Sequence, residues 1–139
     1  MTKMNVFDAI VSRRSVRSYK PDPIEEAKVQ RVLEAVRCAP SAQNRQPYRF
    51  IVIRDPQVQA QIRECYKKDW YLRNRPPIII VACGVISESW KKGPRSTDGL
   101  RDYGDERFAD YWKVDTTIAM QNLMIAATGE GIIVARCFA

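Results

Sequence analysis

The sequence predicts a single domain in which amphipathic helices are combined with short apolar strands. Its 139 residues are enough for one ordinary domain with a buried core. Apolar residues recur at helical spacing in several segments, and other segments are rich in β-branched residues. The composition, 45% hydrophobic and 28% charged, is typical of a globular protein. We therefore expect one mixed helix-and-strand domain that covers residues 1–139.

The first helix is predicted to start at Asn5, which can cap it, with Asp8 three residues later completing a box-like start. One face of this helix is apolar through Val6, Phe7, Ile10 and Val11. Arg13 and Arg14 then lie at its C-terminal end, where each cation interacts favourably with the helix dipole by about 0.3–1 kcal/mol.

A second helix is predicted to start in the segment 22–25, which offers a cap, a proline for the first helical position and acidic residues. Its core face consists of Val29, Val32, Leu33 and Val36. Pro40 ends the helix, and the polar segment 39–47 follows it. Taken alone, this segment is typical of an ordinary loop.

The middle of the chain is predicted to contain two strands and a helix. Residues 48–54 read as a strand, and Asp55-Pro56 then starts a helix with an apolar stripe at Val58, Ile62, Cys65 and Tyr66. Residues 78–85 form a continuous apolar run rich in β-branched residues, which favours a central strand buried on both faces.

The last third begins with the polar segment 87–104, which we expect to be a long loop or lid that gates a substrate. Trp90 within it is expected to anchor the loop more readily than to stack on a ligand. Residues 111–128 form a helix that is apolar on nearly all sides, so it should be buried in the domain or in an oligomer interface. A further strand is predicted at 132–135.

Composition excludes several classes of chemistry. The chain has no histidine, which removes Ser-His and Cys-His catalysis and most zinc and haem sites. Its four cysteines are widely scattered and predict buried thiols, with neither a zinc site nor a disulfide framework. The apolar run 78–86 is too short to span a membrane, and the N-terminal residues lack a signal-peptide core, so we expect a cytoplasmic protein.

Two polar clusters in the first fifty residues carry the functional prediction. The first places three guanidinium groups and a hydroxyl within residues 13–17, and this donor set suits a phosphate group. In an extended backbone, Ser15 and Arg17 would project to the same side. The second cluster, 39–47, offers amides, a hydroxyl and prolines that suit a planar heterocycle. Together the clusters predict a bound nucleotide-like cofactor.

A net charge of +7 also suggests nucleic acid as a ligand, but only weakly. The basic residues are interleaved with acidic ones and form no long run, whereas a nucleic-acid site concentrates them on one face. A positive field that steers small anionic ligands is the alternative explanation.

The two clusters, followed by the helix that contains Asp115, Gln121-Asn122-Leu123 and Ala126-Ala127, resemble the nitroreductase family of flavin enzymes from about Asn5 to Gly131. Members of that family bind FMN and form intertwined homodimers with the flavin between subunits. The resemblance implies an α+β fold of three layers, with a central mixed, mainly antiparallel sheet flanked by helices.

The resemblance also implies roles for individual residues. The FMN phosphate, ribityl chain and ring edge would be held by Arg13, Arg14, Ser15 and Arg17. The loop that covers the flavin ring from the partner subunit would contain Pro40, Ser41, Ala42 and Asn44. Gln46 would support that loop, and Gly131 would belong to a turn near the flavin. No side chain is assigned as catalytic, because the flavin carries the chemistry.

The implied activity is electron transfer from NADH or NADPH to a nitroaromatic, quinone or similar acceptor by a ping-pong mechanism. Two alternatives stay open: a flavin-binding protein of the same fold with lost or altered activity, and a basic module without flavin. The residues after Gly131 depart from the family's Gly-Leu-Gly turn, and family members usually continue further, with a basic residue for the flavin phosphate. This departure suggests a truncation or a shifted reading frame.

Overall fold

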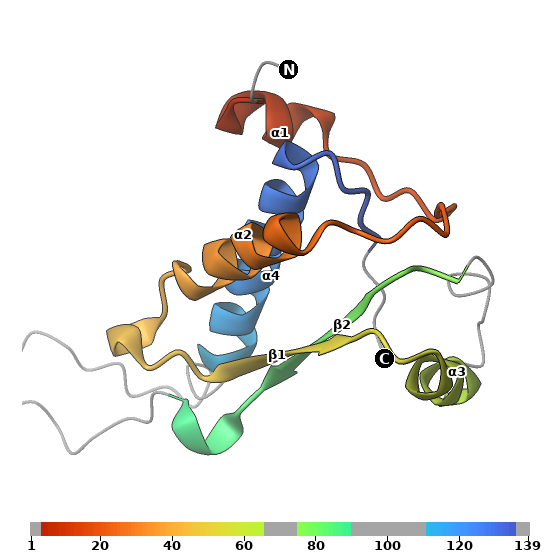
Figure 1. Cartoon of the computed structure of the whole chain (residues 1–139). Helices are drawn as coiled ribbons and strands as arrows, with labels where there is room; N and C mark the ends of the chain where they lie inside the picture. Colours follow the sequence, from red (N-terminus) through yellow and green to blue (C-terminus); the bar gives the residue numbers. More distant parts are fainter. Residues whose placement is uncertain (1–3, 66–74, 90–110, 136–139) are drawn as a thin grey trace, which may run out of the picture.

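The computed structural model describes residues 4–65, 75–89 and 111–135 (Figure 1). In chain order, its helices and strands are α1 (Val6–Ser12), α2 (Glu26–Arg37), β1 (Tyr48–Ile53), α3 (Pro56–Cys65), β2 (Ile79–Gly84) and α4 (Tyr111–Gly129). Short 3₁₀ turns lie at Ala42–Asn44 and Ile86–Glu88. Helix α4 packs against α2, α1 and both strands, whereas α3 lies apart at the far end of the strand pair.

The core lies where α2 crosses α4. Both helices contribute small or branched residues to it, and Tyr48 of β1 closes it from the side of the sheet. The buried helix residues are Val32, Val36, Ala119, Leu123, Met124 and Ala127. A hydrogen bond from the Asn122 amide to the Ala35 carbonyl, 3.1 Å long, also joins the two helices. The predicted core face of α2 is confirmed, with Leu33 only half-buried.

The described sheet consists of β1 paired antiparallel with β2, in a register that runs from Tyr48 opposite Gly84 to Ile53 opposite Ile79. The predicted limits of both strands are correct to within one residue. The prediction that β2 is buried on both faces is wrong for the described part of the chain, since all six of its residues are half-exposed. The strand packs against α4.

Helix α1 has the predicted start but places its apolar face differently. The Asn5 side chain accepts a hydrogen bond of 2.9 Å from the Asp8 N–H, which confirms the cap. Only Ala9 is buried, because the helix turns this small residue toward the core. The predicted apolar stripe points outward, with Val6 70% and Phe7 72% exposed.

Two predicted helix details need correction. Helix α2 starts at Glu26 rather than within 22–25, because the chain stays extended through Glu25, whose carbonyl accepts the first helical hydrogen bonds. The predicted start of α3 at Asp55-Pro56 is confirmed, with Asp55 accepting the Gln57 N–H at 2.7 Å, but Val58 on its predicted apolar stripe is 39% exposed. Among the residues of α3 whose burial is described, Gln59 is the buried one, and it donates to the carbonyls of Ile53 and Pro77.

Other predictions are partly met or lie outside the described residues. The bounds of α4 are confirmed to within one residue, although Val114 on it is 53% exposed. Cys38 is exposed and Cys83 is half-exposed, so the prediction of buried thiols is wrong for these two. Tyr66, Trp90 and most of the predicted lid lie outside the described residues.

Close contact between β2 and α4 makes Gly84 sensitive to substitution. A Cβ atom at this position would collide with ring carbons of Trp112 on α4, one of them only 2.8 Å away. We expect Gly84→Ala to lower the free energy of unfolding by about 1–3 kcal/mol, because the rigid indole must move. Gly129→Ala is the control, since nothing lies within 4 Å of its Cβ position, and helix propensity predicts a gain of up to about 1 kcal/mol. Urea denaturation measures the free energy of unfolding of both variants. An equal change in the two would contradict a collision between the added methyl group and Trp112.

Candidate functional site

The predicted phosphate-binding cluster lies just beyond the C-terminus of α1. Arg13 occupies the C-cap position, and the chain is extended from there on. Ser15 forms a parallel β-bridge with Val134. Within the described residues, this single bridge is all that forms of the strand predicted at 132–135. This bridge holds the cluster beside the chain that leaves α4. The predicted change from helix to extended backbone at the arginines is therefore confirmed.

The side chains of this cluster are donors close to solvent. Arg14 donates from Nη1 to the carbonyls of Val11 (2.7 Å) and Arg13 (2.8 Å), so it caps α1 as the helix-dipole interpretation predicts. Arg13 Nη1 lies 3.5 Å from Ser15 Oγ. Arg14 and Ser15 are exposed, and Arg13 and Arg17 are half-buried. Since each guanidinium carries five N–H donors, the cluster can bind an anion while Arg14 keeps its bonds to the helix.

The second predicted cluster, residues 39–47, is a strained loop. Within the described chain, every non-glycine residue with a positive φ lies in it: Gln43 (52°), Asn44 (55°) and Gln46 (49°). Such conformations are costly for residues with a side chain, at about 1–3 kcal/mol each, and persist only where the surroundings enforce them.

Hydrogen bonds within and around the loop hold this shape. Ser41 accepts the Asn44 N–H at its carbonyl (2.9 Å) and the Gln46 N–H at its Oγ (2.9 Å). The carbonyl of Pro47 accepts the Val85 N–H at 2.8 Å, which ties the loop to the end of β2. The Ser41 hydroxyl thus supports the loop, and Pro40 and Asn44 remain exposed.

Asp115 also contributes to this site, although the sequence did not assign it a role. It lies in the second turn of α4 and is only 3% exposed. Both of its carboxylate oxygens lie 3.2 Å from the Ala42 nitrogen, so the Ala42 N–H is shared between them. Burial raises the pKa of Asp115, and the Ala42 N–H offsets part of this effect. An acidic residue within an otherwise apolar helix was the sequence signal that could have identified it.

The structure places the two clusters at opposite ends of α4 (Figure 1). Ala42 contacts Asp115 near the start of the helix, whereas Ser15 contacts Val134 beyond its end. About 20 Å of helix separates Asp115 from Gly129. Gly131 lies on the side of the arginines, where its φ of +73° ends the helix. One copy of the chain therefore places the first set of predicted residues at one end of α4 and the second set at the other: Arg13, Arg14, Ser15, Arg17 and Gly131, against Pro40, Ser41, Ala42, Asn44 and Gln46.

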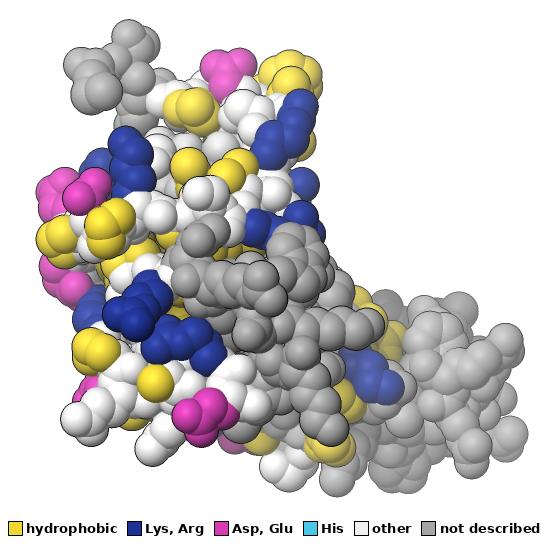
Figure 2. Space-filling view, turned by 90° about the vertical axis from the view of Figure 1, so that its right-hand side faces the viewer, with side chains coloured by type: hydrophobic (Ala, Val, Ile, Leu, Met, Phe, Trp, Pro, Cys, Tyr) yellow, Lys and Arg dark blue, Asp and Glu magenta, His cyan; other side chains and the backbone are white. Residues whose placement is uncertain are grey.

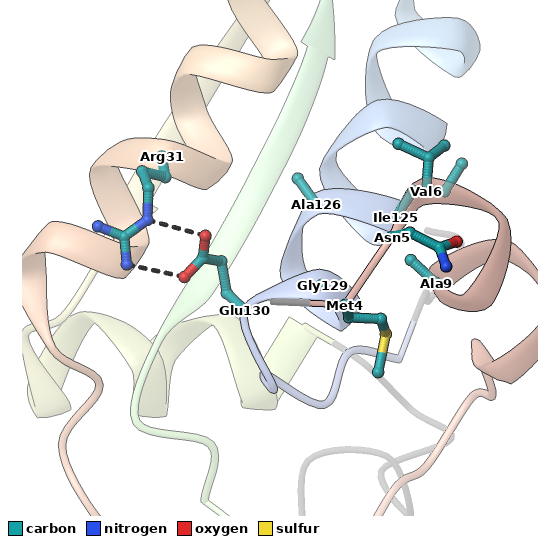
Figure 3. Close-up of a pocket in the computed structure, with 9 residues that line it drawn as sticks. All are labelled: Met4, Asn5, Val6, Ala9, Arg31, Ile125, Ala126, Gly129 and Glu130. Atoms are coloured by element: carbon teal, nitrogen blue, oxygen red, sulfur yellow. Dashed lines mark hydrogen bonds and ion pairs between the residues drawn. The ribbon is translucent and has the colours of Figure 1, made fainter. Parts of the chain in front are cut away.

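A cavity of about 160 Å³ lies elsewhere, between the start of α1, helix α2 and the end of α4 (Figure 3). At its edge, Arg31 forms a bidentate ion pair with Glu130, with distances of 2.8 and 2.7 Å. None of the predicted site residues lines this cavity. It is therefore separate from the candidate site.

On the face displayed in Figure 2, the described residues form no continuous basic stripe. Figure 2 shows Lys and Arg side chains in several groups with acidic side chains among them on the face displayed. The described residues contain no cluster of three or more potential metal ligands. None of the helices within them is long and apolar enough to cross a membrane.

The family model for the nitroreductase family matches residues 10–134, which include the residues of both clusters. The chain belongs to the nitroreductase family. A relative from Methanothermobacter thermautotrophicus, whose name pairs NADH dehydrogenase with NAD(P)H nitroreductase, is 30% identical over 95% of this chain and 60% of its own length. Protein DrgA of Synechocystis is 35% identical over 92% of this chain and 68% of its own length.

The nitroreductase fold is confirmed by solved structures. An FMN-dependent nitroreductase from Clostridium difficile matches with a TM-score of 0.68 and 25% identity, over 88% of this chain and 60% of that one. The α+β class predicted from the resemblance is therefore correct, and the described part shows an antiparallel strand pair and a parallel bridge. This chain spans about three fifths of the length of several such nitroreductase relatives.

The raised pKa of Asp115 predicts a dependence of stability on pH. The native protein holds the Asp115 proton to a higher pH than the unfolded chain, where the ordinary pKa is 3.8. The contribution of this group to the free energy of unfolding therefore falls as pH rises from 3.8 through the native value. Asp115→Asn removes this titration, so the variant should gain stability relative to wild type across that window and show a constant difference above it. Urea denaturation at a series of pH values measures this, and a difference that does not vary with pH would contradict it.

Proposed function

We propose that this nitroreductase-family chain binds FMN and, as a homodimer, transfers electrons from NADH or NADPH to a nitroaromatic, quinone or similar acceptor. The observation that carries the proposal is the basic cluster at residues 13–17, partly exposed and held in place by the Ser15–Val134 bridge at the end of α4. The proposal is also supported by the name of the related Clostridium difficile protein, an FMN-dependent nitroreductase.

The donors present fit the phosphate end of FMN. A phosphate group needs charge-assisted donors from several directions, and Arg13, Arg14 and Arg17 offer these within five residues. Ser15 adds a neutral hydroxyl, which lies 3.5 Å from Arg13 Nη1. Bound FMN would supply the hydride and electron chemistry, while the residues of this chain bind and orient it.

The opposite ends of α4 support a site made by two copies. Within one copy, about 20 Å of helix separates the arginine end from the strained loop. A flavin that contacts both clusters is therefore best shared, with the arginines of one copy facing residues 39–47 of the other. In this arrangement Pro40, Ser41, Ala42 and Asn44 would cover the ring, and Gln46 would support them from within the loop.

An exposed apolar surface on α1 supports the dimer. Its residues are more than 40% exposed although they are apolar, and such patches commonly mark protein interfaces. They are Met4, Val6, Phe7, Ile10 and Val11. The patch adjoins the arginine cluster along the chain, so a second copy seated on it would lie close to the proposed phosphate site.

A single binding position for donor and acceptor implies a ping-pong order. NAD(P)H would occupy the open face of the ring first and leave as NAD(P)⁺, and the acceptor would then take its place. The chain needs no histidine or metal for this order of steps, because water can supply the protons.

Purified protein titrated with FMN, followed by NAD(P)H oxidation with a quinone or a nitroaromatic, tests the proposal. Protein that binds FMN without turnover would favour a flavin-binding protein that has lost activity, and protein that binds none would exclude both.

Loss of one guanidinium should weaken FMN binding measurably. We expect Arg17→Ala to cost about 1.5–3 kcal/mol, roughly tenfold to a hundredfold in the dissociation constant, because a charge-assisted phosphate contact is lost. Arg54→Ala is the matched control, since Arg54 pairs with Glu26 at the surface (2.7 Å) and belongs to neither cluster. Flavin fluorescence titration measures both affinities. Unchanged FMN affinity in Arg17→Ala would show that Arg17 does not contact the phosphate.

A charge on the α1 surface should weaken the dimer. Phe7 is 72% exposed in one copy, and its replacement in Phe7→Glu would bury a carboxylate among apolar groups if this surface is the interface. We expect the dimer dissociation constant to rise at least about tenfold. Sedimentation velocity over a range of concentrations measures the change, and an unaltered monomer–dimer equilibrium would remove α1 from the interface.

A further inference from the structure

We propose that Asp115 is a positioning residue: its buried carboxylate fixes the Ala42 N–H and thereby holds the loop of residues 39–47 in the shape that covers the flavin ring. The inference rests on the proposed function for the flavin itself. The contact between carboxylate and loop stands on the structure alone.

Asp115 belongs to a rigid element, whereas the loop that it contacts has little regular structure. Helix α4 is fixed against α2 by the buried Ala119 and Leu123, one and two turns further along from Asp115. The carboxylate is therefore held in one place, and only 3% of the residue is exposed. Its two oxygens are both 3.2 Å from the Ala42 nitrogen, so this one amide is the target of a charge-assisted interaction.

The contact falls where the loop needs support. Ala42 is the first residue of the 3₁₀ turn, and the left-handed residues Gln43 and Asn44 follow it directly. The first amides of a helical turn have no acceptor within the turn. Asp115 provides one at the start of the strained stretch, and Ser41 Oγ provides another at its end by accepting the Gln46 N–H. The shape of the loop is thus fixed at both ends.

A merely structural role would be better served by an apolar residue. Burying a carboxylate is costly unless hydrogen bonds compensate it, and both oxygens of Asp115 share a single N–H. The raised pKa of Asp115 reflects this cost of burial. The benefit that offsets it is directional, because a carboxylate can accept an N–H and a methyl group cannot.

Two replacements separate these roles: Asn is the isostere of Asp, and Leu has the same branching but is larger and apolar. Asp115→Leu keeps the branching but cannot accept the Ala42 N–H, whereas Asp115→Asn keeps one carbonyl acceptor. We expect Asp115→Leu to fold with unchanged or higher thermal stability, to bind FMN at least about tenfold more weakly, and to exchange the Ala42 amide hydrogen faster. Asp115→Asn should stay within about threefold of wild type in FMN affinity, which would be rescue by the conservative variant.

The outcomes that overturn the inference are specific. Wild-type FMN affinity and wild-type protection of the Ala42 amide in Asp115→Leu would overturn it. Asp115→Ala repeats the test if the leucine variant is not recovered folded, and loss of folding in both would assign Asp115 to the core instead. Amide exchange is measured without FMN, so it tests the contact even if wild-type protein binds no flavin. If the wild-type protein binds no FMN, the proposed function is refuted, and the exchange rate of the Ala42 amide alone then decides whether Asp115 holds the loop.

Discussion

The packing of α2 against α4 is the constraint on which the rest of this structure depends. Ala119 and Ala127 are completely buried or nearly so, and residues this small let the two helices approach closely. The hydrogen bond from Asn122 to the Ala35 carbonyl adds a polar link within the same interface. Close-packed helices of this kind are stiff. Each group attached to an end of α4 therefore has a fixed position relative to the others.

The two ends of α4 hold their groups by different physical means. At the C-terminal end, the positive φ of Gly131 ends the helix, and the Ser15–Val134 bridge then fixes the arginine segment through the backbone. At the other end, a buried carboxylate fixes one amide of a loop with several left-handed residues. The first arrangement leaves the charged side chains partly exposed, as the proposed anion site requires. The second fixes a backbone shape at a cost in stability, because it buries a carboxylate and holds residues at positive φ; such strain is common where a loop meets a ligand.

The exposed surfaces of the single chain follow from the same arrangement. Helix α1 turns only Ala9 toward the core, which leaves an apolar face outside, close to the arginines. A site divided between the ends of one helix is completed most simply by a second copy of the chain. The apolar face of α1 and the separation of the two clusters thus support the same dimeric arrangement from independent observations.

The sequence by itself determined whatever depends on near neighbours in the chain. The Asn5 cap, the limits of β1 and β2, the core face of α2 and the extent of α4 follow from spacing and local chemistry. The two polar clusters stood out by their donor groups, and the roles that the resemblance implies for their residues stay predictions. Only the tertiary structure decided which apolar faces are covered. The stripe of α1 is exposed and Gln59, rather than Val58, is buried on α3, because burial depends on what packs opposite. It also decided that Asp115 meets Ala42, residues 73 positions apart, since a contact of that range is set by helix packing and leaves no local pattern.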